Sequence, residues 1–195
     1  GLTVFAAHLS IPVDDDERPT LDAAAAYGLQ RVIVPWYPAE TFDTADGVKA
    51  LADKLNRAYD VCKANGLVLG YHNHDFEFKS LDGRPAYDLL LELINPEIFM
   101  EVDLYWVKTA GYDPAALVQR LGARAPLLHF KDGPTVRGEP MTAIGDGVMD
   151  LKAVNAVSQA EWHIVEIDNC ATDMMQAIEK SYHTMQREGF AHGKR

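Results

Sequence analysis

Apolar segments and helix-like segments alternate along the whole chain. The pattern predicts six buried strands, in "LTVFAAHLS", "RVIVPW", "LVLGYHNH", "IFMEVDLYWV", "APLLHFKD" and "EWHIVEID". Strands that are apolar throughout and that alternate with helices are typical of a parallel sheet covered by helices. No linker or low-complexity segment interrupts this alternation. We therefore predict an α/β fold in a single domain over residues 1–195.

The helical segments are marked by spacing and by their end residues. Between Asp46 and Gly66, apolar residues recur at helical intervals: Val48, Leu51, Ala52, Leu55, Ala58, Tyr59 and Cys62. Glycines are expected to end this helix and the one in "TLDAAAAYG". Asp113 and Pro114 form a capping and first-turn pair for "AALVQRL". No glycine-rich phosphate loop follows a strand, which disfavours a nucleotide-binding doubly wound sheet.

Composition and charge exclude several classes of function. Apolar residues make up 48% and charged residues 24% of the chain, as in globular proteins. No apolar run approaches the ~20 residues of a membrane span, so no membrane association is expected. The net charge is −11 and the cations are scattered, which argues against a nucleic-acid partner. Cys62 and Cys170 lie in no metal or redox motif, which favours reduced thiols in a cytoplasmic protein.

Ionisable residues lie near the carboxyl ends of the last four predicted strands. They are His72 or His74, then Asp103, His129 and Glu166, each about one strand–helix unit after the previous one. In a (β/α)8 barrel such residues converge on one face, where chemistry takes place. Two imidazoles together with two carboxylates would bind a divalent metal. Mn, Zn, Co or Fe suits this donor set better than Mg.

Each of these residues also has an ordinary structural explanation. A histidine in an apolar strand is commonly a hydrogen-bonded core residue. Asp103 could cap a helix, and Glu166 could be half of an ion pair. Buried imidazoles and carboxylates without partners are costly, however, and shared ligation of one cation accounts for all four together.

Five segments carry a resemblance to a known family, in the order "LGYHNHDFEF", "EVDLYWVKTAGYDP", "LLHFKDGP", "IGDGVMDL" and "HIVEIDN". The chain resembles the xylose isomerase-like TIM-barrel family, in its sugar phosphate isomerase/epimerase group. The resemblance implies a (β/α)8 barrel that is N-terminally incomplete, with about six strands, opening at the family's third strand. An open barrel leaves sheet edges that another subunit could cover, so a homo-oligomer is one possibility.

The resemblance also implies a ligand set. Asp103, His129 and Glu166 match the metal ligands that the family carries on its sixth, seventh and eighth strands. The fourth ligand of the family's sugar epimerases is a glutamate that doubles as a proton-transfer base, and this sequence has His72 at that place. Metal binding is expected, whereas the paired-glutamate mechanism lacks one of its glutamates.

Further residues are candidates for proton transfer and substrate binding. Lys131 should point inward with His129 and could bind a substrate oxygen, or it could form a salt bridge to Asp132 or Glu166. Trp106 and His8 could also face the substrate, with core or rim packing as the alternative for Trp106. Glu166 is the first candidate base, followed by three others: His74, Glu77 and Lys131. Glu77 has the alternative of a solvated loop carboxylate.

These inferences predict a metal-dependent isomerase or epimerase that acts on a keto sugar or related polyol through an enediolate. The scarcity of cations near the site favours a neutral substrate over a phosphate ester. A lyase of the same fold, resembling inosose dehydratases, is the closest alternative. A sugar-binding or degenerate barrel without activity is a further one, and the net charge of −11 argues against a repair endonuclease related to endonuclease IV.

Overall fold

The computed structural model describes residues 3–192. The chain divides into two compact units, Gly1–Glu101 (unit 1) and Val102–Arg195 (unit 2). Each unit is described by itself. The prediction of a single domain over residues 1–195 stays a prediction.

Unit 1 contains a curled parallel sheet. Its strands β1 (Ala6–His8), β2 (Arg31–Val34), β3 (Val68–His72) and β6 (Phe99–Asp103) pair in that order, and β6 extends into unit 2 by its last two residues. All three pairings are parallel, as predicted. The register places His72 opposite Glu101, so these two side chains lie on the same face of adjacent strands.

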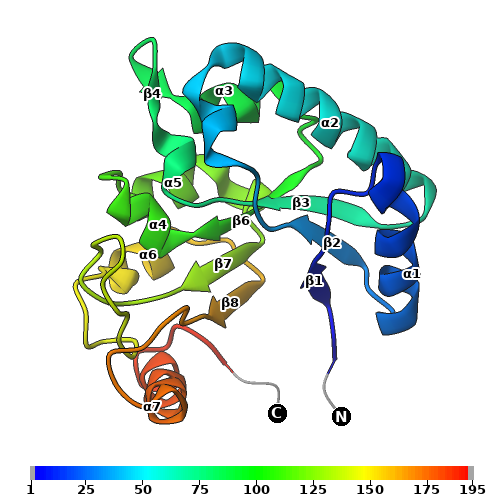
Figure 1. Ribbon diagram of the computed structural model, residues 1–195. Helices are drawn as coiled ribbons and strands as arrows, with labels where there is room; N and C mark the ends of the chain where they lie inside the picture. Colours follow the sequence, from blue (N-terminus) through cyan, green and yellow to red (C-terminus); the bar gives the residue numbers. More distant parts are fainter. Residues whose placement is uncertain (1–2, 193–195) are drawn as a thin grey trace. The chain divides into compact units, whose positions relative to one another are not determined.

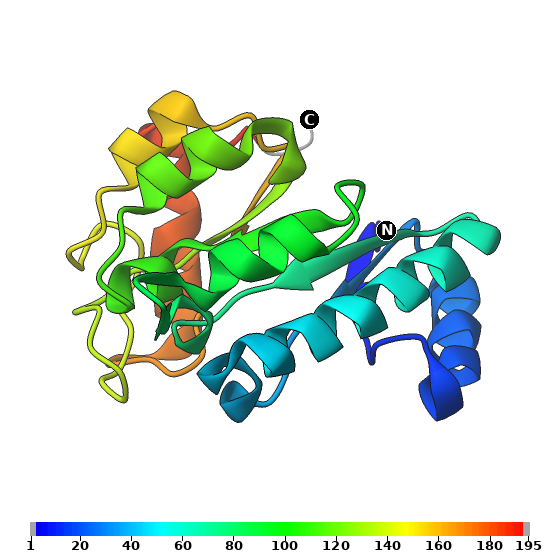
Figure 2. The same cartoon turned by 90° about the horizontal axis from the view of Figure 1, so that it is seen from above.

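Three helices belong to unit 1: α1 (Glu17–Tyr27), α2 (Ala45–Ala64) and α3 (Ala86–Leu93). The apolar stripe predicted for α2 is buried in full, and the helix packs against β3 and α3 (Figures 1 and 2). Gly28 ends α1 in the left-handed conformation, with φ of 64°, as predicted. A short hairpin that was not predicted, β4 (Ser80–Leu81) and β5 (Arg84–Pro85), precedes α3.

Unit 2 pairs β7 (Leu127–Phe130) with β8 (Trp162–Val165) in parallel. Its helices are α4 (Leu104–Thr109), α5 (Pro114–Leu121), α6 (Leu151–Val157) and α7 (Met174–Arg187). The six strands in parallel ladders are the six that the sequence predicts. One boundary was wrong: "IFMEVDLYWV" is not extended throughout, because Asp103 ends the strand and caps α4.

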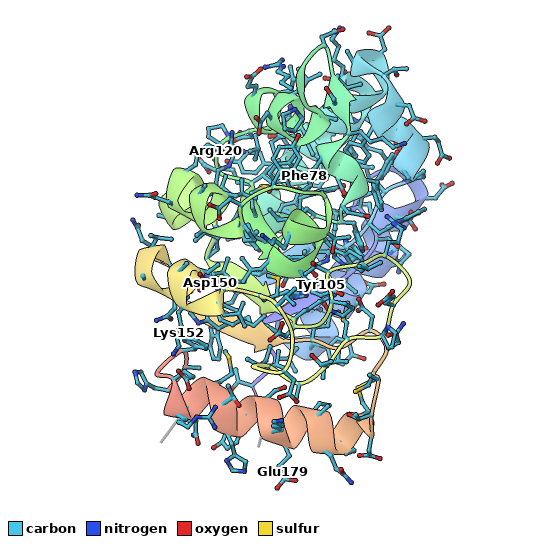
Figure 3. All side chains as sticks on the ribbon, turned by 90° about the vertical axis from the view of Figure 1, so that its left-hand side faces the viewer. Phe78, Tyr105, Arg120, Asp150, Lys152 and Glu179 are labelled. Carbon is cyan, nitrogen blue, oxygen red and sulfur yellow. The ribbon has the colours of Figure 1, made fainter. Side chains whose placement is uncertain are left out.

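In unit 2, α6 contacts both α5 and the end of α7. Figure 3 shows α5, which carries Arg120, beside α6, which carries Lys152 and is capped by Asp150. Lys152 reaches the end of α7, where its Nζ lies 2.8 Å from the Glu188 carboxylate. Glu179 on α7 points away from the other helices (Figure 3). No helix in the described part of the chain is both long enough and apolar enough to span a membrane.

Candidate functional site

Three of the predicted metal ligands meet in unit 2. Asp103 is the last residue of β6, His129 lies in β7, and Glu166 directly follows β8. One ligand atom from each side chain lies within 4.8 Å of the ligand atoms of the other two. His72, the predicted fourth ligand, belongs to unit 1, and its place in this set stays a prediction.

Asp103 performs two tasks with its two oxygens. Its Oδ1 accepts a hydrogen bond from the backbone N–H of Trp106, 3.0 Å away, and so caps α4. Its Oδ2 lies 2.9 Å from Lys131 Nζ and 3.8 Å from His129 Nδ1. The capping role that the sequence left open is therefore present, and it fixes the second oxygen toward the cluster.

Lys131 stands at the centre of the unit 2 cluster, with a side chain that is only 2% exposed. Its Nζ lies 2.9 Å from Asp103, 2.7 Å from Glu166 and 2.9 Å from Asp168. Burial lowers the pKa of this ammonium, but the two carboxylates of Asp103 and Glu166 outweigh burial and raise the pKa above its ordinary value. Lys131 therefore carries a full positive charge at neutral pH.

Trp106 lies beside this charge. The centroid of its ring is 5.6 Å from Lys131 Nζ and 5.9 Å from Arg137 Cζ, distances at which cations interact with an aromatic ring. The sequence predicted that Trp106 faces the substrate. The contact with Lys131 places it next to the cluster, and its role in binding stays a prediction.

Glu166 is held by two positive or potentially positive groups. Its Oε2 lies 2.6 Å from His129 Nδ1 and 2.7 Å from Lys131 Nζ. Burial would raise the pKa of this carboxyl, but the His129 contact and the Lys131 charge lower the pKa well below its usual range. Glu166 is consequently an ionised carboxylate throughout the neutral pH range.

The other histidines predicted for the site, His8, His72 and His74, lie in unit 1. The rings of His72 and His74 are 5.1 Å apart, and those of His8 and His72 are 5.2 Å apart. β3 ends at His72, so His74 lies in the following loop, where its ring stacks on Phe76.

Glu77 is not the solvated loop carboxylate that the sequence suggested. It is fully buried, and burial raises its pKa to about 8. Its Oε1 accepts a hydrogen bond from the Tyr71 hydroxyl, 3.0 Å away, and its Oε2 accepts one from the backbone N–H of His74, 2.9 Å away. Glu77 thus fastens the segment that carries both candidate histidines, and its proposed role as a base stays a prediction.

Three functional candidates were missed or misplaced by the sequence. Glu101, two residues before Asp103 on β6, is buried and contacts His8 and His72. Asp168, two residues after Glu166, binds the Lys131 ammonium through both oxygens. Asp132, considered as a partner of Lys131, instead accepts hydrogen bonds from three backbone N–H groups. Glu101 and Asp168 could have been found in the sequence, because each lies two residues from a predicted ligand.

Comparison with known proteins identifies the family. The sequence model described as xylose isomerase-like TIM barrel matches residues 15–170. A sugar phosphate isomerase/epimerase from Parabacteroides distasonis superimposes with a TM-score of 0.79 at 24% identity, over 98% of this chain and 73% of that one. The predicted fold class is confirmed, with six of a barrel's eight strands among residues 3–192.

Two further relatives widen the comparison. An inosose dehydratase from Geobacillus kaustophilus is 28% identical over 141 residues, or 62% of this chain. The chain spans less than half of that relative, 45% of its length. The crystal structure of an IolI protein with a bound zinc atom has a TM-score of 0.67 at 11% identity, over 97% of this chain and 78% of that one.

Proposed function

The chain belongs to the xylose isomerase-like TIM-barrel family, and we propose that it is a divalent-metal-dependent isomerase or epimerase acting on a keto sugar or related polyol. The observation that carries this proposal is the cluster of Asp103, His129 and Glu166 around the Lys131 ammonium in unit 2. TIM-barrel enzymes place their chemistry at the carboxyl ends of the strands, where these residues lie.

The residues of unit 2 fit a divalent cation. Two carboxylates and one imidazole suit Mn, Zn, Co or Fe, and three protein ligands leave positions for substrate oxygens. The Lys131 ammonium already lies between Asp103 Oδ2 and Glu166 Oε2, which marks a point where positive charge is favoured. Asp168 contacts the same ammonium with both oxygens and could retain it when a metal binds. The zinc atom of the IolI structure supports this class of ion.

The proposed reaction begins with removal of a proton from the carbon next to a carbonyl. When bound, a divalent cation supplies Lewis-acid stabilisation of the negative charge that then develops. Glu166 is the candidate base, because its lowered pKa keeps it in the carboxylate form that accepts a proton. The same low pKa makes it a weak base, so most of the driving force must come from stabilisation of the product anion.

Lys131 is better suited to binding than to accepting protons. Its raised pKa keeps all three of its N–H donors in place at neutral pH. The ammonium is held by Asp103, Glu166 and Asp168, so it would donate a hydrogen bond to an enediolate oxygen once the oxygen of Asp103 or Glu166 that it now contacts turns to the metal. Return of a proton then requires a second group, for which His74 is our candidate because imidazoles donate and accept protons near neutral pH.

Dehydration is the second candidate function. The relationship to an inosose dehydratase, at 28% identity, favours it. Isomerisation and dehydration share the first proton abstraction, and they differ in whether a proton returns to carbon or to a leaving hydroxyl. The cluster in unit 2 serves the shared step equally in both reactions.

Hydrogen exchange tests the proposal. The metal-loaded protein is incubated in D₂O with a panel of keto sugars and keto-inositols, and deuterium next to the carbonyl is measured by NMR. Glu166→Gln should abolish exchange, whereas the matched control Glu179→Gln, on an exposed part of α7, should leave it unchanged. Exchange without loss of water supports the isomerase or epimerase. An absorbing enone product would assign the protein as a dehydratase, and no exchange with any substrate would overturn both functions.

A further inference from the structure

A second group of metal-ligating side chains lies wholly within unit 1. His8 Nε2 is 2.5 Å from Glu101 Oε2, and His72 Nδ1 is 3.2 Å from the same oxygen. The side chains of His72 and Glu101 are 4% and 2% exposed, and that of His8 is 35% exposed. The two imidazoles therefore converge on one atom of a buried carboxylate, and one of them is open to solvent.

The curl of the sheet creates this group. His8 is the last residue of β1, and Glu101 lies in β6, three strands away in the order β1-β2-β3-β6. Strands spaced about 4.8 Å apart would separate these positions by about 14 Å in a flat sheet. The short contact between them shows that the inward-facing side chains of unit 1 are drawn together across the concave face. His72, the register partner of Glu101, lies between them.

The floor of this group is apolar. Gly70 and Phe99 stand two residues before His72 and Glu101, on the same face and opposite one another. A Cβ at Gly70 would lie only 2.4 Å from the Phe99 ring, so glycine allows the ring to lie flat against β3. An apolar layer beneath polar ligands limits access of water and strengthens electrostatic interactions with a bound cation.

We propose that His8, His72 and Glu101 of unit 1 bind a divalent transition-metal ion of their own, in addition to the ion proposed for Asp103, His129 and Glu166. Two imidazoles and one carboxylate are a donor set that binds Zn²⁺ or Fe²⁺ and leaves positions open. Ligands of a tetrahedral zinc ion at 2.0–2.1 Å are about 3.3 Å apart, close to the 3.2 Å between His72 and Glu101.

This proposal changes the role expected for His72 and does not depend on the proposed function. The family resemblance assigns His72 to the ligand set completed by Asp103, His129 and Glu166. The contacts of His72 within unit 1 instead place it with Glu101 and His8. The family resemblance predicts one metal ion, whose binding all substitutions in the ligand set should weaken. The present proposal predicts two metal ions, so substitutions of His8 and of Glu166 should affect different ions.

Metal titration of the 195-residue chain distinguishes them. Zn²⁺ binding is measured by calorimetry, and Co²⁺ is used as a visible-absorption probe of each site. The variants are His8→Ala and Glu101→Gln for unit 1 and Glu166→Gln for unit 2. His183→Ala, which removes an exposed histidine on α7, is the matched control. Because His8 is partly exposed, His8→Ala should fold even if Glu101→Gln does not.

We expect two equivalents of Zn²⁺ in the wild-type chain. His8→Ala and Glu101→Gln should weaken the binding of one equivalent by roughly 100-fold or more, because the loss of an outer-shell partner alone lowers metal affinity 10–100-fold. The Co²⁺ spectrum of the other bound ion should stay unchanged. The wild type could instead bind a single equivalent of Zn²⁺ that is lost in His8→Ala but kept in Glu166→Gln. This result would support the unit 1 site, and it would leave the proposed function without a metal ion of its own. Unchanged binding in both unit 1 variants, or one equivalent lost equally in His8→Ala and Glu166→Gln, would overturn the proposal.

Discussion

Replacing Glu77 by glutamine should make the protein more stable at pH 8 and have little benefit at pH 5. The carboxyl of Glu77 is fully buried and bonds to the Tyr71 hydroxyl and the His74 backbone N–H. Burial raises its pKa to about 8. A glutamine has nearly the same shape as the protonated acid and never has to ionise. Its Oε1 can accept from the His74 N–H, and its Nε2 can donate to the Tyr71 hydroxyl oxygen.

The sign of the effect follows from proton binding. In the unfolded chain the carboxyl has its ordinary pKa of 4.5, so between this value and about 8 the folded state binds more protons. The stability that the protonated group contributes is fully present below pH 4.5 and is lost as the pH rises toward 8. The whole difference corresponds to about 5 kcal/mol, of which about half is lost between pH 5 and pH 7.

Urea denaturation at pH 5, 6, 7 and 8 measures this effect. The free energy of unfolding of Glu77→Gln minus that of the wild type should rise by about 2–3 kcal/mol between pH 5 and pH 7 and flatten above pH 8. Other titrating groups cancel in the difference. The exposed Glu179→Gln should give a flat difference. If the Glu77→Gln difference is also flat, Glu77 ionises normally in the folded protein, and the account of its burial is wrong.

Three other substitutions test particular contacts. Lys131→Met should tighten Zn²⁺ binding to the unit 2 ligands by about tenfold or more, because the ammonium no longer competes for their oxygens; weaker binding in calorimetry would contradict this. Gly70→Ala should destabilise the fold by about 1–3 kcal/mol through its clash with the Phe99 ring, with part of the loss recovered in a double variant with Phe99→Leu. Asp132→Asn should cost about 1–3 kcal/mol and speed amide exchange in the loop that Asp132 holds, because one of its three N–H partners loses its acceptor; unchanged exchange would show that the loop is held by other contacts.

Much of the fold could be predicted because the apolar pattern is local. The seven apolar residues that mark α2 in the sequence are its seven buried residues, since a helix buries one face at fixed intervals. The end of β6 could not be placed from the pattern, because "LYWV" is apolar whether it continues a strand or begins a helix. The Asp103 side chain decides in favour of the helix by capping it.

The candidate site was predicted only in part, because contacts across a curled sheet depend on register. Asp103, His129 and Glu166 were found from their place at strand ends, which topology alone brings together. The buried state of Glu77 was missed because a charged residue between two phenylalanines in a loop gives no sign of burial in the sequence. The contact of His8 with Glu101 requires the curvature of four strands, which no short pattern encodes.

A period of two at the strand ends connects each candidate ligand with a second charged residue, of which Glu101 and Asp168 were missed and Lys131 was predicted. Glu101 precedes Asp103 by two, Lys131 follows His129 by two, and Asp168 follows Glu166 by two, so each pair points to the same side of its extended segment. One member of each pair was recognised as a ligand. The other member contacts charged or titratable neighbours. Lys131 forms ion pairs with the carboxylates of Asp103 and Glu166, Asp168 binds Lys131, and Glu101 contacts His8 and His72. Each of these three strand ends therefore carries a candidate ligand together with a second charged residue two positions away, and both must be read from the sequence to predict the chemistry.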